Sequence, residues 1–380
     1  MAESDVQQTG KAPFAAPLSA ADEHRHRWKI GWRRAVRDRW HRSIRHPLEM
    51  AFTLACVWLV RRLSVDGCSA FGAWLGRAIG YRSGRTRIAR AALHAIFPEW
   101  PKEKVEHTVL AMWDHLGRIA MEYVRLDGFR GEAGRGRLMI EGIERLHALR
   151  DDGQGALIVS GHVGHWEMIT LALQEAGVTP LHVVYRPANN AAMNRLIRSL
   201  QGDSDVDLIP KGAPGARRIM AALKAGGHVV MLVDQKMNDG IETQFFGRPA
   251  MTAPAVAQLA LRFACPVVPI RVERVGSFQR AGRKAAEPAD VSMTGTSATG
   301  EDAWGARFKV SVGAEIERPK GEDKKANILS LMNAINAELE GWIQDRPEQW
   351  LWVHQRWSQH PPAAQSEDHP LAPSVENNGQ

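Results

Sequence analysis

The chain has 380 residues, of which 44% are hydrophobic and 24% charged, and it carries a net charge of +7. This is the composition of a globular protein with a buried core, and the positive charge favours nucleic acid, an anionic membrane or an acidic substrate as partner. Three cysteines without a CxxC pair (Cys56, Cys68 and Cys265) exclude an even-numbered disulfide framework and fit a reducing, cytoplasmic environment.

Residues 1–24 are polar, rich in Ala, Gln and Ser, and we expect them to be disordered. The segment 25–45 has nine Lys or Arg residues against the single acid Asp38, so its charge of +8 exceeds that of the whole chain. Tryptophan and isoleucine are interleaved with these cations, which favours an amphipathic segment lying on a lipid interface. A solvated basic tail or a nucleic-acid-binding arm is the alternative.

Two apolar runs follow, at residues 48–60 and 70–79, with Arg61 and Arg62 between them. The first run is shorter than the roughly 20 residues that a membrane-spanning helix needs, and it begins too late for a signal peptide. We therefore predict a helical membrane anchor over residues 25–80, monotopic or hairpin-like, with a single tilted span as the alternative.

From Lys102 apolar residues recur every three or four positions as far as Leu126, which predicts a long helix. A glycine-rich connector, 127–135, comes next. Beyond it we expect strands at 138–141, 156–160, 181–185, 206–209, 228–233, 267–272 and 307–316. The expected helices are 144–150, 165–176, 191–201, 213–225, 253–263 and 326–344.

Repeated strand–helix units predict an α/β fold, with a mixed, mostly parallel sheet flanked by helices, over a domain at residues 81–358. Residues 275–305 lack periodicity, and we expect an exposed insertion there between two antiparallel edge strands. Residues 361–380 are expected to be a disordered tail.

The chemistry is expected where a strand ends. His162 follows the apolar run 156–159 and Ser160-Gly161, and Glu167 comes five residues later at a helix start. A carboxylate one helical turn away can orient an imidazole, so the pair resembles a general base with its orienting acid. No Ser or Cys nucleophile stands beside it, so the nucleophile would come from a substrate, as in a transferase. His165 makes a metal site conceivable, although a place at the helix start is favoured because no third ligand has a recognisable spacing.

Other polar side chains follow the remaining strands. Arg186 and Lys211 each end a strand and could bind a phosphate. Asp234 and Gln235 follow a very apolar strand, and an aromatic-Gly-Arg turn containing Arg248 comes after them, which indicates the wall of a substrate pocket. Surface salt bridges are the alternative for the cations.

Several motifs together resemble a known family. His162 and Glu167 match the His-x4-Asp/Glu signature of glycerolipid and lipid A acyltransferases, members of the lysophospholipid-acyltransferase-like superfamily. The segments 185–190, 233–236, 245–249, 265–270 and 346–357 follow in an order that resembles the late acyltransferases of bacterial lipid A biosynthesis, which use lauroyl, myristoyl or very-long-chain donors. The resemblance covers roughly residues 47–357. The basic arm and the 275–305 insertion depart from it.

The resemblance implies that His162 deprotonates a hydroxyl of a lipid A precursor, a phosphorylated glucosamine disaccharide, and that the alkoxide attacks the thioester of acyl carrier protein. Glu167 would orient His162, backbone N–H groups near Gly164 would stabilise the oxyanion, and Arg186 would bind a phosphate. No metal, other cofactor or nucleic acid is implied, and the place of action would be the cytoplasmic face of the bacterial inner membrane. The alternatives are an acyltransferase for another glycolipid, such as a phosphatidylinositol mannoside, and a non-enzymatic basic protein that binds membranes or nucleic acid.

Overall fold

The structure is a computed structural model that describes residues 46–187, 191–201, 206–275 and 306–357. Its internal contacts divide the chain into two units, residues 1–58 and 59–380. The expectations for residues 1–24, for the basic segment 25–45, for 276–305 of the insertion and for 361–380 concern segments outside the described residues.

Helix α2 (His46–Val60) is the described part of the first unit and continues two residues into the second. Among the helices that the structure describes, none is both long and apolar enough to cross a membrane. Helix α3 (Val65–Ala78), the other half of the expected anchor, packs within the second unit against α5 (Lys102–Glu122). The two helices approach so closely that a Cβ on Gly72 would lie 2.2 Å from the carbonyl oxygen of Gly117.

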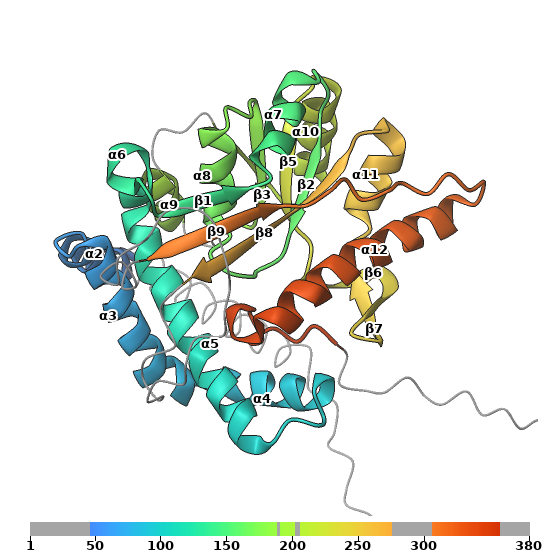
Figure 1. The fold of residues 1–380 in the computed structure, drawn as a ribbon. Helices are drawn as coiled ribbons and strands as arrows, with labels where there is room; N and C mark the ends of the chain where they lie inside the picture. Colours follow the sequence, from blue (N-terminus) through green and yellow to red (C-terminus); the bar gives the residue numbers. More distant parts are fainter. Residues whose placement is uncertain (1–45, 188–190, 202–205, 276–305, 358–380) are drawn as a thin grey trace, which may run out of the picture. The chain divides into compact units, whose positions relative to one another are not determined.

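In the described residues, seven strands form one sheet: β1 Leu138–Glu141, β2 Leu157–Ser160, β3 Leu181–Tyr185, β4 Val206–Pro210, β5 His228–Leu232, β8 Val267–Val275 and β9 Arg307–Val312. Their order across the sheet is β1-β9-β8-β2-β5-β3-β4 (Figure 1). All neighbours are parallel except β8 and β9, so the expected mixed, mostly parallel sheet is confirmed. The expectation that β8 and β9 are edge strands is wrong, because β1 pairs in parallel with β9 and takes the edge itself.

Helices cover both faces of the sheet, as expected, because the central strands are apolar on both sides. The remaining helix bounds are α4 Arg85–Ile96, α6 Gly131–Gly134, α7 Ile143–Asp151, α8 Glu167–Glu175, α9 Ala191–Gln201, α10 Ala213–Lys224, α11 Ala255–Phe263 and α12 Lys324–Asp345. Leu157 and Val159 of β2 face one core, shared with α4, α5, α10, α11 and α12, whereas Ile158 faces the other, shared with α7 and α8. Short 3-10 segments lie at Gly80–Arg82, Tyr123–Phe129 and Pro347–Gln349.

A hairpin, β6 (Lys236–Phe245) and β7 (Arg248–Thr252), was not expected from the sequence. Its inward position 243 is a threonine whose hydroxyl is bonded within the hairpin, so the usual apolar alternation is missing. The turn is formed by Phe246 and Gly247, both with positive φ, as a tight hairpin turn requires. Two boundaries also differ: the long helix becomes 3-10 at Tyr123, before the expected end, and α8 begins at Glu167 rather than at residue 165.

A buried ion pair joins α5 to β8. Arg274 donates to both carboxylate oxygens of Glu122, and both side chains are almost inaccessible to solvent. Burial alone would raise the pKa of Glu122, but the charge and hydrogen bonds of Arg274 more than offset it and hold the pKa at about 2. His165, fully buried, lies 3.8 Å from the same carboxylate, so the pair supports the turn that carries His162.

Replacing Glu122 by Gln should lower the free energy of unfolding by roughly 3–5 kcal/mol, because Arg274 then remains buried without its counter-charge. A carboxylate with a lowered pKa stabilises the fold fully above its unfolded pKa of about 4.5, and this contribution is lost as the pH falls towards 2. Urea denaturation of both proteins at pH 7 and at several values below pH 4.5 measures this difference. The control Glu132→Gln, in an exposed pair with Arg135, should change little. An equal stability of wild type and Glu122→Gln at pH 7 would contradict this account.

Candidate active site

His162 and Asp234 meet because β2 and β5 are parallel neighbours. The register pairs Ser160 of β2 with Leu232 of β5, and each strand is followed two residues later by one member of the pair. The carboxyl ends of parallel strands share one edge of the sheet, which is where ligands bind in such folds. The backbone therefore places the imidazole and the carboxylate side by side at the centre of this edge.

Asp234 holds His162 by two hydrogen bonds. The ring Nδ1 of His162 lies 2.8 Å from Oδ1 of Asp234, and the backbone N–H of His162 donates to Oδ2 at 2.9 Å. Burial alone would raise the pKa of Asp234, but the charge of His162 and three hydrogen bonds lower it, so the carboxylate is ionised. An ionised carboxylate can only accept hydrogen bonds, which places the hydrogen on Nδ1 of His162 and leaves Nε2 as the basic nitrogen.

Glu167 was expected to orient His162, and here the structure differs. The partner of the His162 ring is Asp234, which the sequence had indicated as a substrate-binding residue. Glu167 begins α8 and accepts a hydrogen bond at 3.3 Å from Gln201, the last residue of α9. In the described part of the chain it makes no hydrogen bond to His162, because α8 starts at this residue and its first turn directs the carboxylate to α9. Asp234 reaches the ring across the strand pair instead.

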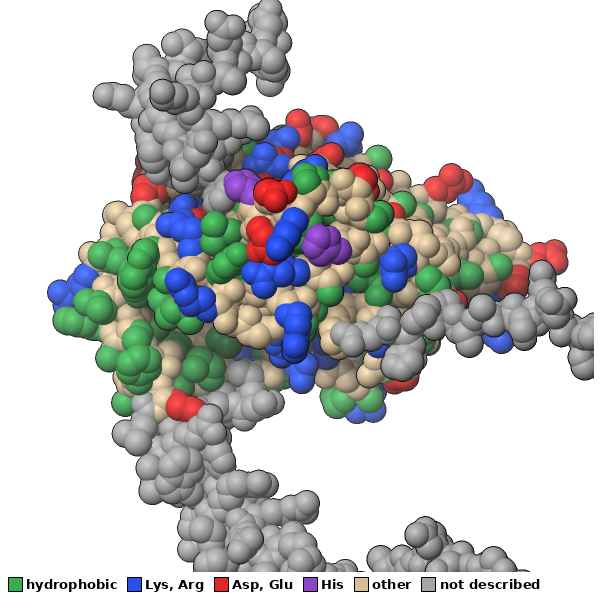
Figure 2. Space-filling view, turned by 90° about the horizontal axis from the view of Figure 1, so that it is seen from below, with side chains coloured by type: hydrophobic (Ala, Val, Ile, Leu, Met, Phe, Trp, Pro, Cys, Tyr) green, Lys and Arg blue, Asp and Glu red, His purple; other side chains and the backbone are tan. Residues whose placement is uncertain are grey.

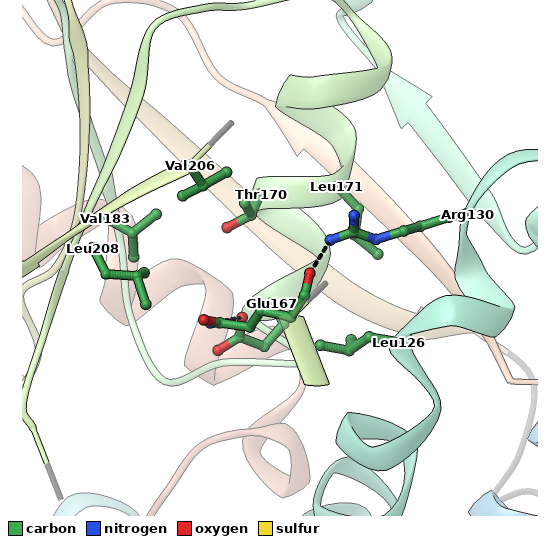
Figure 3. A pocket seen from close by; sticks show the side chains of 9 residues that line it. Leu126, Arg130, Glu167, Thr170, Leu171, Val183, Val206 and Leu208 are labelled. Atoms are coloured by element: carbon green, nitrogen blue, oxygen red, sulfur yellow. Dashed lines mark hydrogen bonds between the residues drawn. The ribbon is translucent and has the colours of Figure 1, made fainter. Parts of the chain in front are cut away.

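Glu167 lies in a small pocket beside the site. Figure 3 shows its carboxylate among mostly apolar side chains, with Arg130 at the rim. The other labelled lining residues are Leu126, Thr170, Leu171, Val183, Val206 and Leu208. Burial raises the pKa of Glu167, and the hydrogen bond from Gln201 offsets this only in part. The pocket thus combines an apolar wall with one acid that is protonated more readily than usual.

Three of the expected substrate-binding side chains line the same edge. The register of β3 with β4 pairs Tyr185 with Pro210, so Arg186 and Lys211 follow adjacent strand ends and are both exposed. Partial desolvation, together with the charge of Arg186, lowers the pKa of Lys211, whereas the charge of Asp234 opposes this shift. The side-chain nitrogen of Gln235 lies 3.4 Å from Nε2 of His162.

Two expected contributions look different in the structure. The backbone N–H of Gly164 donates to the carbonyl of Gln349 at 3.0 Å, so this group is engaged and is not a free oxyanion donor. Glycine is required at this position because φ is +60° and a Cβ would lie 2.0 Å from the carbonyl oxygen of Val272. Arg248, at the start of β7, donates to the carbonyl of Ala95 in α4 and not to the His162–Asp234 pair.

The C-terminal segment contributes residues that the sequence did not single out. The indole nitrogen of Trp350 donates to Oδ2 of Asp234 at 2.8 Å, and the ring centroid of His354 lies 6.3 Å from that of His162. The ring of Trp166 is packed edge-on against His162 at 5.0 Å. The only sequence signal was the density of Trp and His in residues 350–357, which the resemblance covered as a motif without individual roles.

His165 is not placed as a metal ligand. It is enclosed between the rings of Phe129 and Phe308, and neither of its ring nitrogens has a hydrogen-bond partner. Within the described ranges, no three His, Cys, Asp or Glu residues are close enough together to hold a metal ion.

The chain is similar to known acyltransferases. The family model for bacterial lipid A biosynthesis acyltransferases matches residues 38–359. A lipid A biosynthesis palmitoleoyltransferase of Escherichia coli (strain K12) is 25% identical over 82% of this chain and 91% of that protein, and a lipid A biosynthesis acyltransferase of Shigella flexneri matches equally well.

Among solved structures, the 1-acyl-sn-glycerophosphate acyltransferase of Thermotoga maritima is similar over 72% of this chain and 95% of the solved chain, with 11% sequence identity and a TM-score of 0.30. The family model covers all of the described residues, from α2 to the C-terminal segment that reaches the His162–Asp234 pair. The chain is therefore an acyltransferase and belongs to the bacterial lipid A biosynthesis acyltransferase family.

Proposed function

We propose that this acyltransferase moves a fatty acyl group from the thioester of acyl carrier protein to a free hydroxyl of a lipid A precursor, with His162 as the general base. The observation that carries the proposal is the His162–Asp234 pair at the centre of the carboxyl-end edge. It supplies a base with a fixed tautomer, which is what an acceptor hydroxyl needs in order to attack a thioester.

The proposed reaction has two steps that use this pair. Nε2 of His162 takes the proton of the acceptor hydroxyl, while Asp234 stabilises the resulting imidazolium. The acceptor oxygen forms a bond to the thioester carbon, and the tetrahedral intermediate collapses with loss of the thiolate, which receives the proton from His162. The amide of Gln235, adjacent to Nε2, is our candidate donor to the oxyanion, since the N–H of Gly164 is already engaged.

The remaining expected residues keep supporting roles in this proposal. Arg186 and Lys211 form an exposed pair of cations that would bind a phosphate of the acceptor or of the carrier protein's pantetheine arm. Glu167 lines the apolar pocket, where burial raises its pKa and the charge of nearby His162 partly offsets this rise. A net charge of +7 suits two anionic partners, acyl carrier protein and a phosphorylated glycolipid. No step in this proposal uses a metal or redox cofactor.

The roles of Asp234 and Glu167 can be distinguished by mutation. His162→Ala and Asp234→Asn should each lower kcat about 10²- to 10⁴-fold, because the base is lost or its tautomer is no longer fixed. Glu167→Gln should cost less than about tenfold, since Glu167 does not bond to the ring. Transfer of radiolabelled acyl groups from acyl carrier protein measures all three.

The matched control is Asp207→Asn. Asp207 also pairs with a histidine, His182, at 3.1 Å, but on β3 and β4 outside the site, so this variant should keep the wild-type rate. A larger loss of kcat for Glu167→Gln than for Asp234→Asn would indicate that Glu167, and not Asp234, orients His162.

The phosphate contacts predict a different kinetic effect. Arg186→Ala and Lys211→Ala should raise KM for a phosphorylated acceptor roughly tenfold each while changing kcat little, because uniform binding energy is removed. Lys224→Ala is the control, since Lys224 is an exposed cation at the far end of α10. If the KM for a dephosphorylated acceptor rises as much as that for the phosphorylated one, these cations do not bind its phosphate.

The described surface supports association with a membrane. Figure 2 shows hydrophobic side chains gathered at one side of the molecule. Within the second unit, Phe71 and Trp74 of α3 and Ile79 directly after it are exposed, Trp74 by 55%, and Arg77 and Arg82 lie close by in sequence. Aromatic and cationic side chains in such proximity favour a lipid interface, and we place the protein at the cytoplasmic face of the inner membrane.

Cells provide the overall test. Deleting the gene should remove one acyl chain from lipid A, seen as a mass loss by mass spectrometry and restored by the wild-type gene but not by the His162→Ala gene. The tagged protein should be recovered with the inner membrane after fractionation. Unchanged lipid A, with a different glycolipid losing an acyl chain, would assign another acceptor. Recovery in the soluble fraction would contradict the location.

A further inference from the structure

Trp350 lies directly behind the catalytic pair. Its side chain is only 2% exposed, and its indole Nε1 donates to Oδ2 of Asp234 at 2.8 Å. The same oxygen accepts the backbone N–H of His162 at 2.9 Å, and the other oxygen, Oδ1, faces the His162 ring. The carboxylate is thus held by three donors from two segments that are far apart in the sequence.

The backbone around Trp350 is itself fixed. The neighbouring Gln349 bonds through its side chain to the N–H of Arg274 at 2.8 Å and to the carbonyl of Arg274 at 3.1 Å, and its own carbonyl accepts the N–H of Gly164. Val163 forms an antiparallel bridge with Trp350. The backbone at Gln349 and Trp350 is therefore anchored both to β8 and to the turn that carries His162.

We propose that Trp350 is a positioning residue for acyl transfer: its indole N–H fixes Oδ2 of Asp234, so that Oδ1 stays aligned with Nδ1 of His162. The proposal rests on the proposed function of His162 as general base. A carboxylate can rotate about its Cβ–Cγ bond, and two donors on Oδ2 remove this freedom. Trp350 is too deeply buried to touch a substrate, so its effect passes through Asp234.

A purely structural role is the competing explanation, because the indole also packs against Phe245, Trp352 and Trp357. Trp352 offers a matched comparison. It is equally buried, and its indole also donates one hydrogen bond, but to the carbonyl of Pro347. The two tryptophans therefore differ mainly in whether the acceptor belongs to the catalytic pair.

Removing the indole N–H of Trp350 should also change the pH dependence of kcat. Without this donor, Asp234 becomes a stronger acceptor for the proton on the His162 ring, so the imidazole stays charged to a higher pH and the acidic limb of the kcat profile moves upward. The other titratable groups facing the pair are Lys211 and Arg356, which act on Asp234, and Glu167 and His354, which interact with His162. All four remain in place in the variants.

The experiment compares full-length Trp350→Phe with Trp352→Phe. We expect Trp350→Phe to lower kcat roughly 10- to 100-fold, as for a lost hydrogen bond to a charged group, with KM for both substrates nearly unchanged and the acidic limb displaced to higher pH. Trp352→Phe should show a similar loss of thermal stability but wild-type kcat and pH profile. An analogue with sulfur in place of the indole N–H, incorporated at position 350, should reproduce the kinetic effect of Trp350→Phe with the ring volume retained.

Wild-type kcat and pH profile in both position-350 variants would overturn the proposal, as would an equal kinetic loss in Trp352→Phe. A second readout separates this failure from failure of the proposed function. In protein labelled with ¹⁵N-histidine, the His162 ring resonances, assigned with His162→Gln, should respond to pH differently in Trp350→Phe and in wild type, whether or not the chain transfers acyl groups. Identical titrations would contradict the positioning role independently of activity.

Discussion

The site depends on one buried carboxylate. Asp234 accepts hydrogen bonds from the backbone and ring of His162 and from the indole of Trp350, which lies 116 residues further along the chain. A buried carboxylate is costly unless its oxygens are satisfied, and here each oxygen has at least one donor. The desolvation that would otherwise neutralise Asp234 is thereby overcome, and the ionised group can fix the tautomer of a base.

A buried ion pair stabilises the turn that carries His162. The ion pair of Glu122 with Arg274 joins α5 to β8, and β8 is in turn bonded to Gln349, whose carbonyl holds the turn at Gly164. Polar groups in this position have few alternative partners, so they specify one arrangement of helix, strand and C-terminal segment. The turn that carries His162 is therefore enclosed between two hydrogen-bond networks, one on Asp234 and one on Glu122. These networks hold the short turn between β2 and α8 in one arrangement.

Much of the fold could be read from the sequence because its signals are local. The apolar runs that became β1 to β5 and β8 are short and bounded by polar or glycine residues, and the apolar spacing in α5 follows the helical repeat. The hairpin β6–β7 was missed because its inward position, Thr243, is polar and its turn uses Phe246 with positive φ. The sequence favoured Glu167 over Asp234 as the partner of the His162 ring for a similar reason: Glu167 is near His162 in sequence, whereas Asp234 is near only in space.

The sequence by itself determined that His162 ends a buried strand, that strand ends carry Arg186, Lys211 and Asp234, and which family the motif order resembles. These features depend on residue type and short spacing, which a linear chain displays directly. The tertiary structure alone decided that β2 lies beside β5, so that the register brings Asp234 to His162, and that the C-terminal segment returns to place Trp350 against both. Strand order and chain return are set by packing across the whole core, and no local pattern encodes them.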